Sequence, residues 1–139
     1  MWRLVVPLAA ILAGCQQPQN VRSTNRGVLH VSIEGDAQPA AIELSYDVGQ
    51  VRVGQQQPLT VRATNVGLDA LEVLGVSLGS TGNGSWFVRD AHGSLAPGAS
   101  LTATVTFAPV GPGAQATQVT FSHDADAALP SARLSGTGI

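Results

Sequence analysis

Apolar and polar residues alternate along most of the chain from Val28 onward. Successive side chains of a β-strand point to opposite faces of a sheet, so alternation places one face on a core and the other in water. The pattern therefore predicts a series of half-buried strands. Their inward-facing residues are Leu29, Val31 and Ile33; Ile42, Leu44, Tyr46 and Val48; Leu59, Val61 and Ala63; Leu101, Ala103, Val105 and Phe107; and Val119 and Phe121.

One further predicted strand, over 71–78, loses its alternation part-way. The phase slips between Val73 and Leu74, immediately before Gly75. An extra residue in one strand of a pair shifts the alternation in this way, and glycine is common at such positions. We expect a β-bulge or a bend there.

Short segments rich in glycine, proline and asparagine separate the predicted strands and indicate turns. They are Val48-Gly49-Gln50, Asn65-Val66-Gly67, Gly82-Asn83-Gly84, Ala96-Pro97-Gly98 and Gly111-Pro112-Gly113. No helical stretch lies between the strands, and a parallel βαβ unit needs a helix for its crossover. The predicted fold class is therefore an all-β antiparallel sandwich.

Three segments also resemble a known family. They are IELSYDVGQVRVGQQQPLTVRATNVG from residue 42, SLAPGASLTATVTFAPVGPG from residue 94, and the terminal RLSGTG from residue 133. In this order they resemble an Ig-like domain of the abnormal-spindle/hydin (ASH) type, with the bacterial choice-of-anchor D domains, over about residues 40 to 138. Tyr46-Asp47-Val48-Gly49 departs from the commoner Asp-Phe-Gly. The resemblance implies an Ig-like β-sandwich, a fold that hosts many functions.

The N-terminal residues have the layout of a secretory signal. Arg3 precedes an apolar run over 4–13, which is too short to span a bilayer because spanning takes about 20 residues. Leu12-Ala13-Gly14-Cys15 then resembles the lipobox of bacterial lipoproteins, in which the cysteine sulfur receives a diacylglycerol and the peptide is cut just before it. The resemblance implies that Cys15 carries acyl chains and holds the protein on a membrane.

The predicted organisation has three parts. Residues 1–14 form a lipoprotein signal peptide, residues 15–27 the lipidated cysteine and a flexible tether, and residues 28–139 the Ig-like domain. The tether prediction rests on the polar segment 16–26, which has no periodicity. Gln16 follows the cysteine, whereas aspartate there favours inner-membrane retention in Gram-negative lipoproteins. We therefore expect a bacterial cell envelope location, at the outer membrane.

Composition narrows the classes of partner. A length of 139 residues suits one domain, and 44% apolar residues suffice for a core. The net charge is −2 and basic residues do not cluster, so no nucleic-acid binding is expected, because phosphate neutralisation needs a basic face. The single cysteine cannot form an internal disulfide or a cysteine-based metal site.

Two adjacent aromatic residues, Trp86 and Phe87, point to opposite faces of a strand. One is expected in the core, and the other can serve as an exposed anchor for a protein or a glycan. We take Trp86 as the possible partner contact.

The segment Ser122 to Ala127 gathers His123, Asp124 and Asp126, which are types of residue that bind metals. Only three side-chain ligands are in reach, and aspartate is also favoured in turns, so turn chemistry is the preferred interpretation. His92 is expected in a loop. No nucleophile elbow, HExxH motif or paired-carboxylate spacing occurs, so we expect neither an enzyme nor a cofactor.

These observations predict a lipid-anchored, non-catalytic binding or structural module that recognises an envelope protein. The alternatives are a carbohydrate-binding module and a metal-handling lipoprotein that uses the 123–126 loop. The strands Leu59–Thr64 and Leu101–Phe107 carry one arginine and no proline or lysine. If either is a sheet edge, it can accept a strand from the partner.

Overall fold

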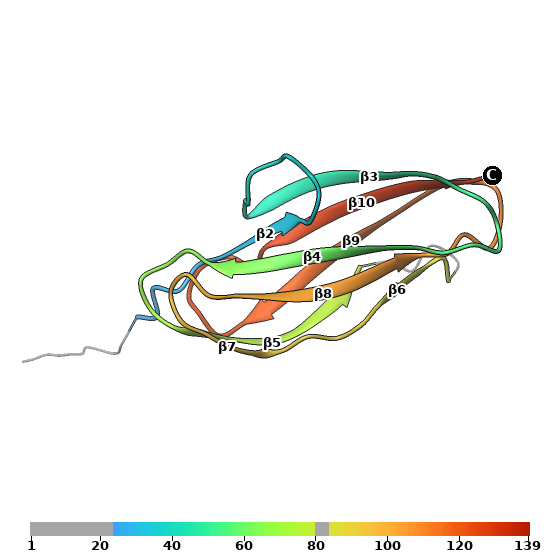
Figure 1. The fold of residues 1–139 in the computed structure, drawn as a ribbon. Helices are drawn as coiled ribbons and strands as arrows, with labels where there is room; N and C mark the ends of the chain where they lie inside the picture. Colours follow the sequence, from blue (N-terminus) through green and yellow to red (C-terminus); the bar gives the residue numbers. More distant parts are fainter. Residues whose placement is uncertain (1–23, 80–83) are drawn as a thin grey trace, which may run out of the picture.

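The computed structural model describes residues 24–79 and 84–139, which form two β-sheets packed face to face (Figure 1). The predicted signal peptide and Cys15 lie outside the described residues. The described residues contain no helix that could cross a membrane. The five-stranded sheet has the order β3 (Glu43–Val51), β10 (Ser131–Gly138), β9 (Gly113–His123), β5 (Leu71–Leu78) and β7 (Gly93–Leu95). The four-stranded sheet has the order β2 (Leu29–Ile33), β4 (Gln57–Asn65), β8 (Ser100–Phe107) and β6 (Trp86–Val88).

The prediction of an Ig-like β-sandwich is confirmed. Neighbouring strands are antiparallel except β3 and β10, which run parallel. Their pairing joins the first and last strands of the five-stranded sheet, so it needs no helical crossover. The strand predicted before the resembling region is β2, an edge strand that pairs with β4.

The core lies between the sheets and is centred on aromatic rings. Phe107 is fully buried, as the alternation in β8 predicted. The centre of its ring lies 4.5 Å from that of the Trp86 ring. Gly136, in the closing LSGTG segment, passes so close that an added Cβ would lie 2.6 Å from the Phe107 ring. The glycine of that motif is therefore required by packing against Phe107.

Of two predictions that rest on a glycine, the bulge before Gly75 and the turn at Gly49, the structure confirms the first and contradicts the second. The predicted bulge in β5 is confirmed, because the register with β9 shifts between Val73 and Gly75. The turn predicted at Val48-Gly49-Gln50 is wrong, since Gly49 lies inside β3. Its φ of 95° and the hydrogen bond from its N–H to the Asp47 carboxylate belong to an irregularity within the strand, where the register with β10 shifts.

Asn65 ties the sheets together at one end of the sandwich. Its side chain is fully buried and accepts from the N–H groups of Val28 and Gly67. Its amide nitrogen donates to the carbonyl oxygens of Asp69, at 2.8 Å, and Leu95, at 3.0 Å. An added Cβ at Gly67 would collide with the backbone of Arg26 and Val28. The Asn-x-Gly motif therefore builds a buried junction as well as a turn.

Hydrogen bonds and an ion pair hold the N-terminal segment against this same end. We call Asn25–Gly27 and these contacts the N-terminal clip. The Asn25 N–H donates to the Asp126 carboxylate at 3.0 Å, and the Arg26 guanidinium pairs with Asp69 at 3.1 Å. The Leu68 N–H donates to the Arg26 carbonyl at 3.1 Å. Asn25 and Arg26, at the end of the predicted tether, therefore bond to the folded domain.

Lowering the pH is expected to loosen this clip first. The Arg26 side chain, by hydrogen bonding, holds the pKa of Asp69 below its ordinary value, which is near 4. The stabilisation is therefore present above the unfolded-state pKa and is lost as the pH falls through the lowered folded-state pKa. Protection factors for amide hydrogen exchange at Arg26 and Leu68 should fall below about pH 4. In Asp69→Asn they should be low at every pH, and a uniform fall across the core would contradict this account.

Candidate functional site

The aromatic pair at β6 has the opposite facing to the one that we predicted. Trp86 is 1% exposed and packs on Phe107, so it cannot be a partner contact in the folded domain. Phe87 is 54% exposed and lies on the outer face of the four-stranded sheet, paired with Thr106 of β8. The exposed anchor is therefore Phe87.

Phe87 forms one side of an apolar groove at the end of the sandwich. The groove has a volume of about 470 Å³ and is also lined by Val53, Ala108, Pro109 and Val110. Val53 and Val110 are exposed large apolar residues, the latter at 61%. We call this region, defined by Val53, Phe87 and Val110, the end groove.

Three main-chain N–H groups of the end groove, those of Val53, Gly54 and Val110, already have partners within the domain. Val53 donates to the Ile139 carbonyl at 3.0 Å and Gly54 donates to the Pro109 carbonyl at 3.4 Å. Val110 donates to the Ser85 hydroxyl at 3.4 Å. Because these donors are satisfied internally, this part of the groove suits an apolar side chain better than a polar ligand.

A second, smaller depression also borders Phe87. It is lined by Val88, Arg89, Thr104 and Thr106. Arg89 is the only charged residue that lines either depression. It makes no ion pair with any other described residue.

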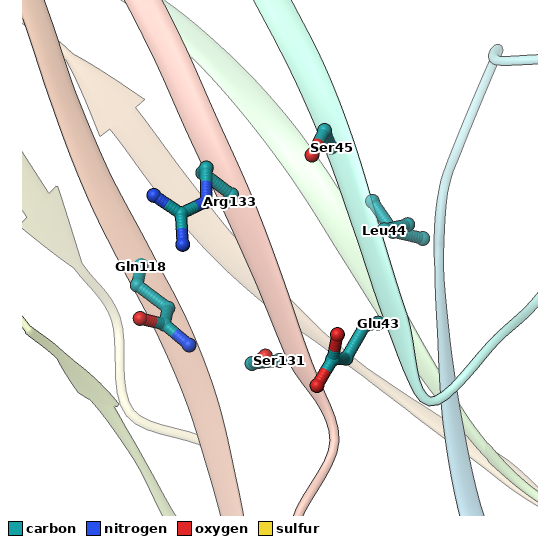
Figure 2. Close-up of a pocket in the computed structure, with 6 residues that line it drawn as sticks. All are labelled: Glu43, Leu44, Ser45, Gln118, Ser131 and Arg133. Atoms are coloured by element: carbon teal, nitrogen blue, oxygen red, sulfur yellow. The ribbon is translucent and has the colours of Figure 1, made fainter.

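A separate polar groove of about 280 Å³ lies on the outer face of the five-stranded sheet (Figure 2). Its lining includes Glu43 from β3, Gln118 from β9, and Ser131 and Arg133 from β10. Figure 2 shows these polar groups spread along three neighbouring strands. They do not converge on one point in the way that a small-ligand site requires.

The candidate metal-binding loop has structural contacts instead. The His123 ring accepts the Ala125 N–H at 3.1 Å, and its other nitrogen lies 3.3 Å from the Ala128 carbonyl oxygen. Asp124 accepts the Glu72 N–H at 2.9 Å, and Asp126 accepts that of Asn25. Among the described residues no group of three or more metal-ligating side chains gathers anywhere. His92 lies exposed in the segment between β6 and β7, as predicted.

The hypothesis of an open edge at Leu59–Thr64 or Leu101–Phe107 is wrong. Both segments are central strands of the four-stranded sheet, because β4 pairs with β2 and β8, and β8 pairs with β4 and β6. Their low charge reflects this protected position, since a paired strand needs no charge to prevent association.

The edges on the β2–β3 side are blocked. In β2, the Val31 N–H and carbonyl both bond to Ala41. Where β4 extends beyond the end of β2, its edge includes Pro58, which has no N–H to donate. The Pro58 carbonyl accepts a hydrogen bond from the side-chain amide of Gln57. In β3, the Ser45 carbonyl accepts the Gln38 side chain at 2.7 Å. These contacts disfavour strand addition there.

Residues 40–137 match the family described as HYDIN/CFA65/VesB-like, Ig-like domain. The chain belongs to this HYDIN/CFA65/VesB-like family. No curated protein sequence matches the chain. An Ig-like domain of this family agrees with the broad class predicted from the sequence, a non-catalytic binding or structural module.

Solved structures share the fold at low sequence identity. A Porphyromonas gingivalis protein of unknown function has a TM-score of 0.62 at 16% identity, with 91% of this chain and 54% of that chain covered. The Vibrio cholerae VesB protease has a TM-score of 0.54 at 15% identity, with 68% and 30% covered. The ASH/PapD-like domain of human CEP192 has a TM-score of 0.51 at 14% identity, with 88% and 92% covered.

These likenesses concern the fold alone. This member of the HYDIN/CFA65/VesB-like family spans about half of the P. gingivalis chain and less than a third of the VesB protease chain. In contrast, it spans nearly all of the CEP192 domain. The match to VesB therefore covers a minor part of that protease.

Proposed function

We propose that this protein is a lipid-anchored module of a bacterial cell envelope, held by acyl chains on Cys15, that recognises a protein partner through the end groove. The anchor rests on the LAGC segment in front of a short apolar run. The recognition surface rests on one observation, the exposure of Phe87 beside Val53 and Val110. Exposed aromatic residues next to apolar depressions are common centres of protein interfaces.

The geometry of the domain suits this arrangement. The chain leaves the N-terminal clip at Val28, which bonds to Asn65 at the end of β4, and the end groove includes Gln56, just before β4 starts at Gln57. Figure 1 shows that β4 runs from one end of the sandwich toward the other. Nine residues of extended strand separate the two ends by about 30 Å. A domain anchored through its N-terminus would therefore carry the groove at the end that is farther from the attachment point.

Cys15→Ser is expected to abolish anchoring, because serine has no thiol for the lipid to alkylate. The variant should accumulate as an unprocessed precursor and partition into the aqueous phase of a detergent separation. Mass spectrometry of the wild-type N-terminal peptide should show a mature residue Cys15 carrying acyl mass. A mature N-terminus at Cys15 without acyl mass would overturn the anchor.

Phe87→Ala is expected to release the protein from its partner with little loss of stability. Its ring is 54% exposed, so truncation leaves no internal cavity. On native gels of mildly solubilised membranes, the wild type should migrate in a complex and Phe87→Ala as the free protein. Leu74→Ala removes another exposed apolar side chain, on β5, and should migrate like the wild type. Equal migration of the wild type and Phe87→Ala would count against recognition by the end groove.

A further inference from the structure

We infer that the end groove binds a peptide segment of the partner in which an apolar side chain lies near an acidic residue. This inference rests on the proposed function and adds the chemistry of the partner. The apolar side chain enters between Phe87 and Val110, and the acidic residue pairs with Arg89.

The preference for an apolar side chain of the partner follows from the residues that line the end groove. Its exposed walls are Val53, Phe87 and Val110, and the main-chain N–H groups of Val53, Gly54 and Val110 bond within the domain. Between Phe87 and Val110 an apolar side chain loses its contact with water at little polar cost, because these three N–H groups are already bonded. Gln55 and Gln56, which also line the groove, can donate to and accept from the main chain of a peptide.

The preference for an acidic residue of the partner follows from the distribution of charged side chains on the domain. Arg89 is exposed beside Phe87, and no carboxylate lines either depression that borders that ring. The opposite end of the domain carries Glu72, Asp124 and Asp126, none of which has an ion pair among the described residues, and Asp69, which pairs with Arg26. An acidic segment is therefore attracted to the groove end and repelled from the clip end.

Three of the edge strands, β2, β3 and β6, have main-chain groups that are already bonded or covered. The edges of β2 and β3 are blocked by Ala41 and Gln38. At β6, Trp86 is 1% exposed, so its main chain is covered. Recognition through side chains in the end groove is thus favoured over addition of a strand.

A displayed library of random twelve-residue peptides, selected against the mature full-length protein in detergent micelles, tests the inference. The wild type should enrich peptides with an apolar and an acidic residue close together. Selection against Arg89→Glu should enrich a basic residue in place of the acidic one. A wild-type peptide should bind Arg89→Glu about 10-fold more weakly, which is the effect of placing like charges together at a partly exposed contact.

Arg133→Glu is the matched control, because Arg133 is an exposed arginine on the outer face of the other sheet. The selected motif should be the same with this variant as with the wild type. Three results would overturn the inference: no enriched motif, a motif unchanged by Arg89→Glu, or a motif changed equally by Arg133→Glu. The native-gel test of Phe87→Ala detects the complex whatever sequence the partner has. The inference about the peptide motif can therefore fail while the proposed function stands.

Discussion

Phe107→Ala is expected to lower the free energy of unfolding by about 3–5 kcal/mol. The ring is fully buried between the sheets, stacks on Trp86 and packs against Gly136, so its removal leaves a cavity that the glycine cannot fill. Such a loss is a large share of the stability of a small domain, which is about 5–15 kcal/mol. Urea unfolding followed by tryptophan fluorescence or circular dichroism measures it.

The control for this experiment lies on the same strand. Thr104 is exposed on the outer face of β8, and Thr104→Ala should cost less than about 1 kcal/mol. Similar losses at Phe107 and Thr104 would mean that the facing of β8 is wrong.

Asn65→Ala is expected to cost about 4 kcal/mol. The change leaves two N–H groups and two carbonyl groups, from Val28, Gly67, Asp69 and Leu95, without the partner that they share. Each buried polar group without a partner costs about 1–3 kcal/mol, and some of the four will relax toward water. Urea unfolding measures the total, and amide hydrogen exchange should show the greatest loosening at Val28 and Gly67.

Two further variants separate the hydrogen bonds from side-chain size. Asn65→Asp keeps the shape but turns an oxygen toward the carbonyls of Asp69 and Leu95, so it should also be strongly destabilised. Gln118→Ala removes an amide from the exposed outer face of β9 and should be nearly neutral. A cost below about 1 kcal/mol for Asn65→Ala would contradict the role of Asn65 as a buried junction.

The strands were predictable because their spacing is a local property. Alternation over several residues identifies the inward face of a strand, and it placed Val61, Val105 and Phe121 correctly in the core. The same rule could not decide between Trp86 and Phe87. β6 has only three residues, so it contains no alternation long enough to set the phase.

The order of strands in each sheet was not predictable from local pattern. Strands β4 and β8 have little charge, which suits an unprotected edge and a central position equally well. Their place depends on pairing between distant segments, for example β2 with β4 and β6 with β8. Gly49 is similar, because a glycine with positive φ serves a turn and a strand irregularity alike, and only pairing with β10 distinguishes them.

The end groove could not be predicted from the sequence for a related reason. Val53 and Val110 lie in connections between strands, outside every alternating run. The fold brings these connections together with Phe87, which is far from both in the sequence. A valine beside a turn glycine, as in Val53-Gly54 and Val110-Gly111, was the one local signal of an exposed apolar end.

Site-specific photo-crosslinking in living cells tests recognition by the end groove most directly. A photoreactive residue at Thr106, which lies beside Phe87, should give a defined adduct with one envelope protein. The adduct should disappear in Phe87→Ala and persist in Leu74→Ala, and a photoreactive residue at Gln118, on the other sheet, should not form it. An adduct at Thr106 that survives Phe87→Ala, or equal adducts from Thr106 and Gln118, would contradict the account.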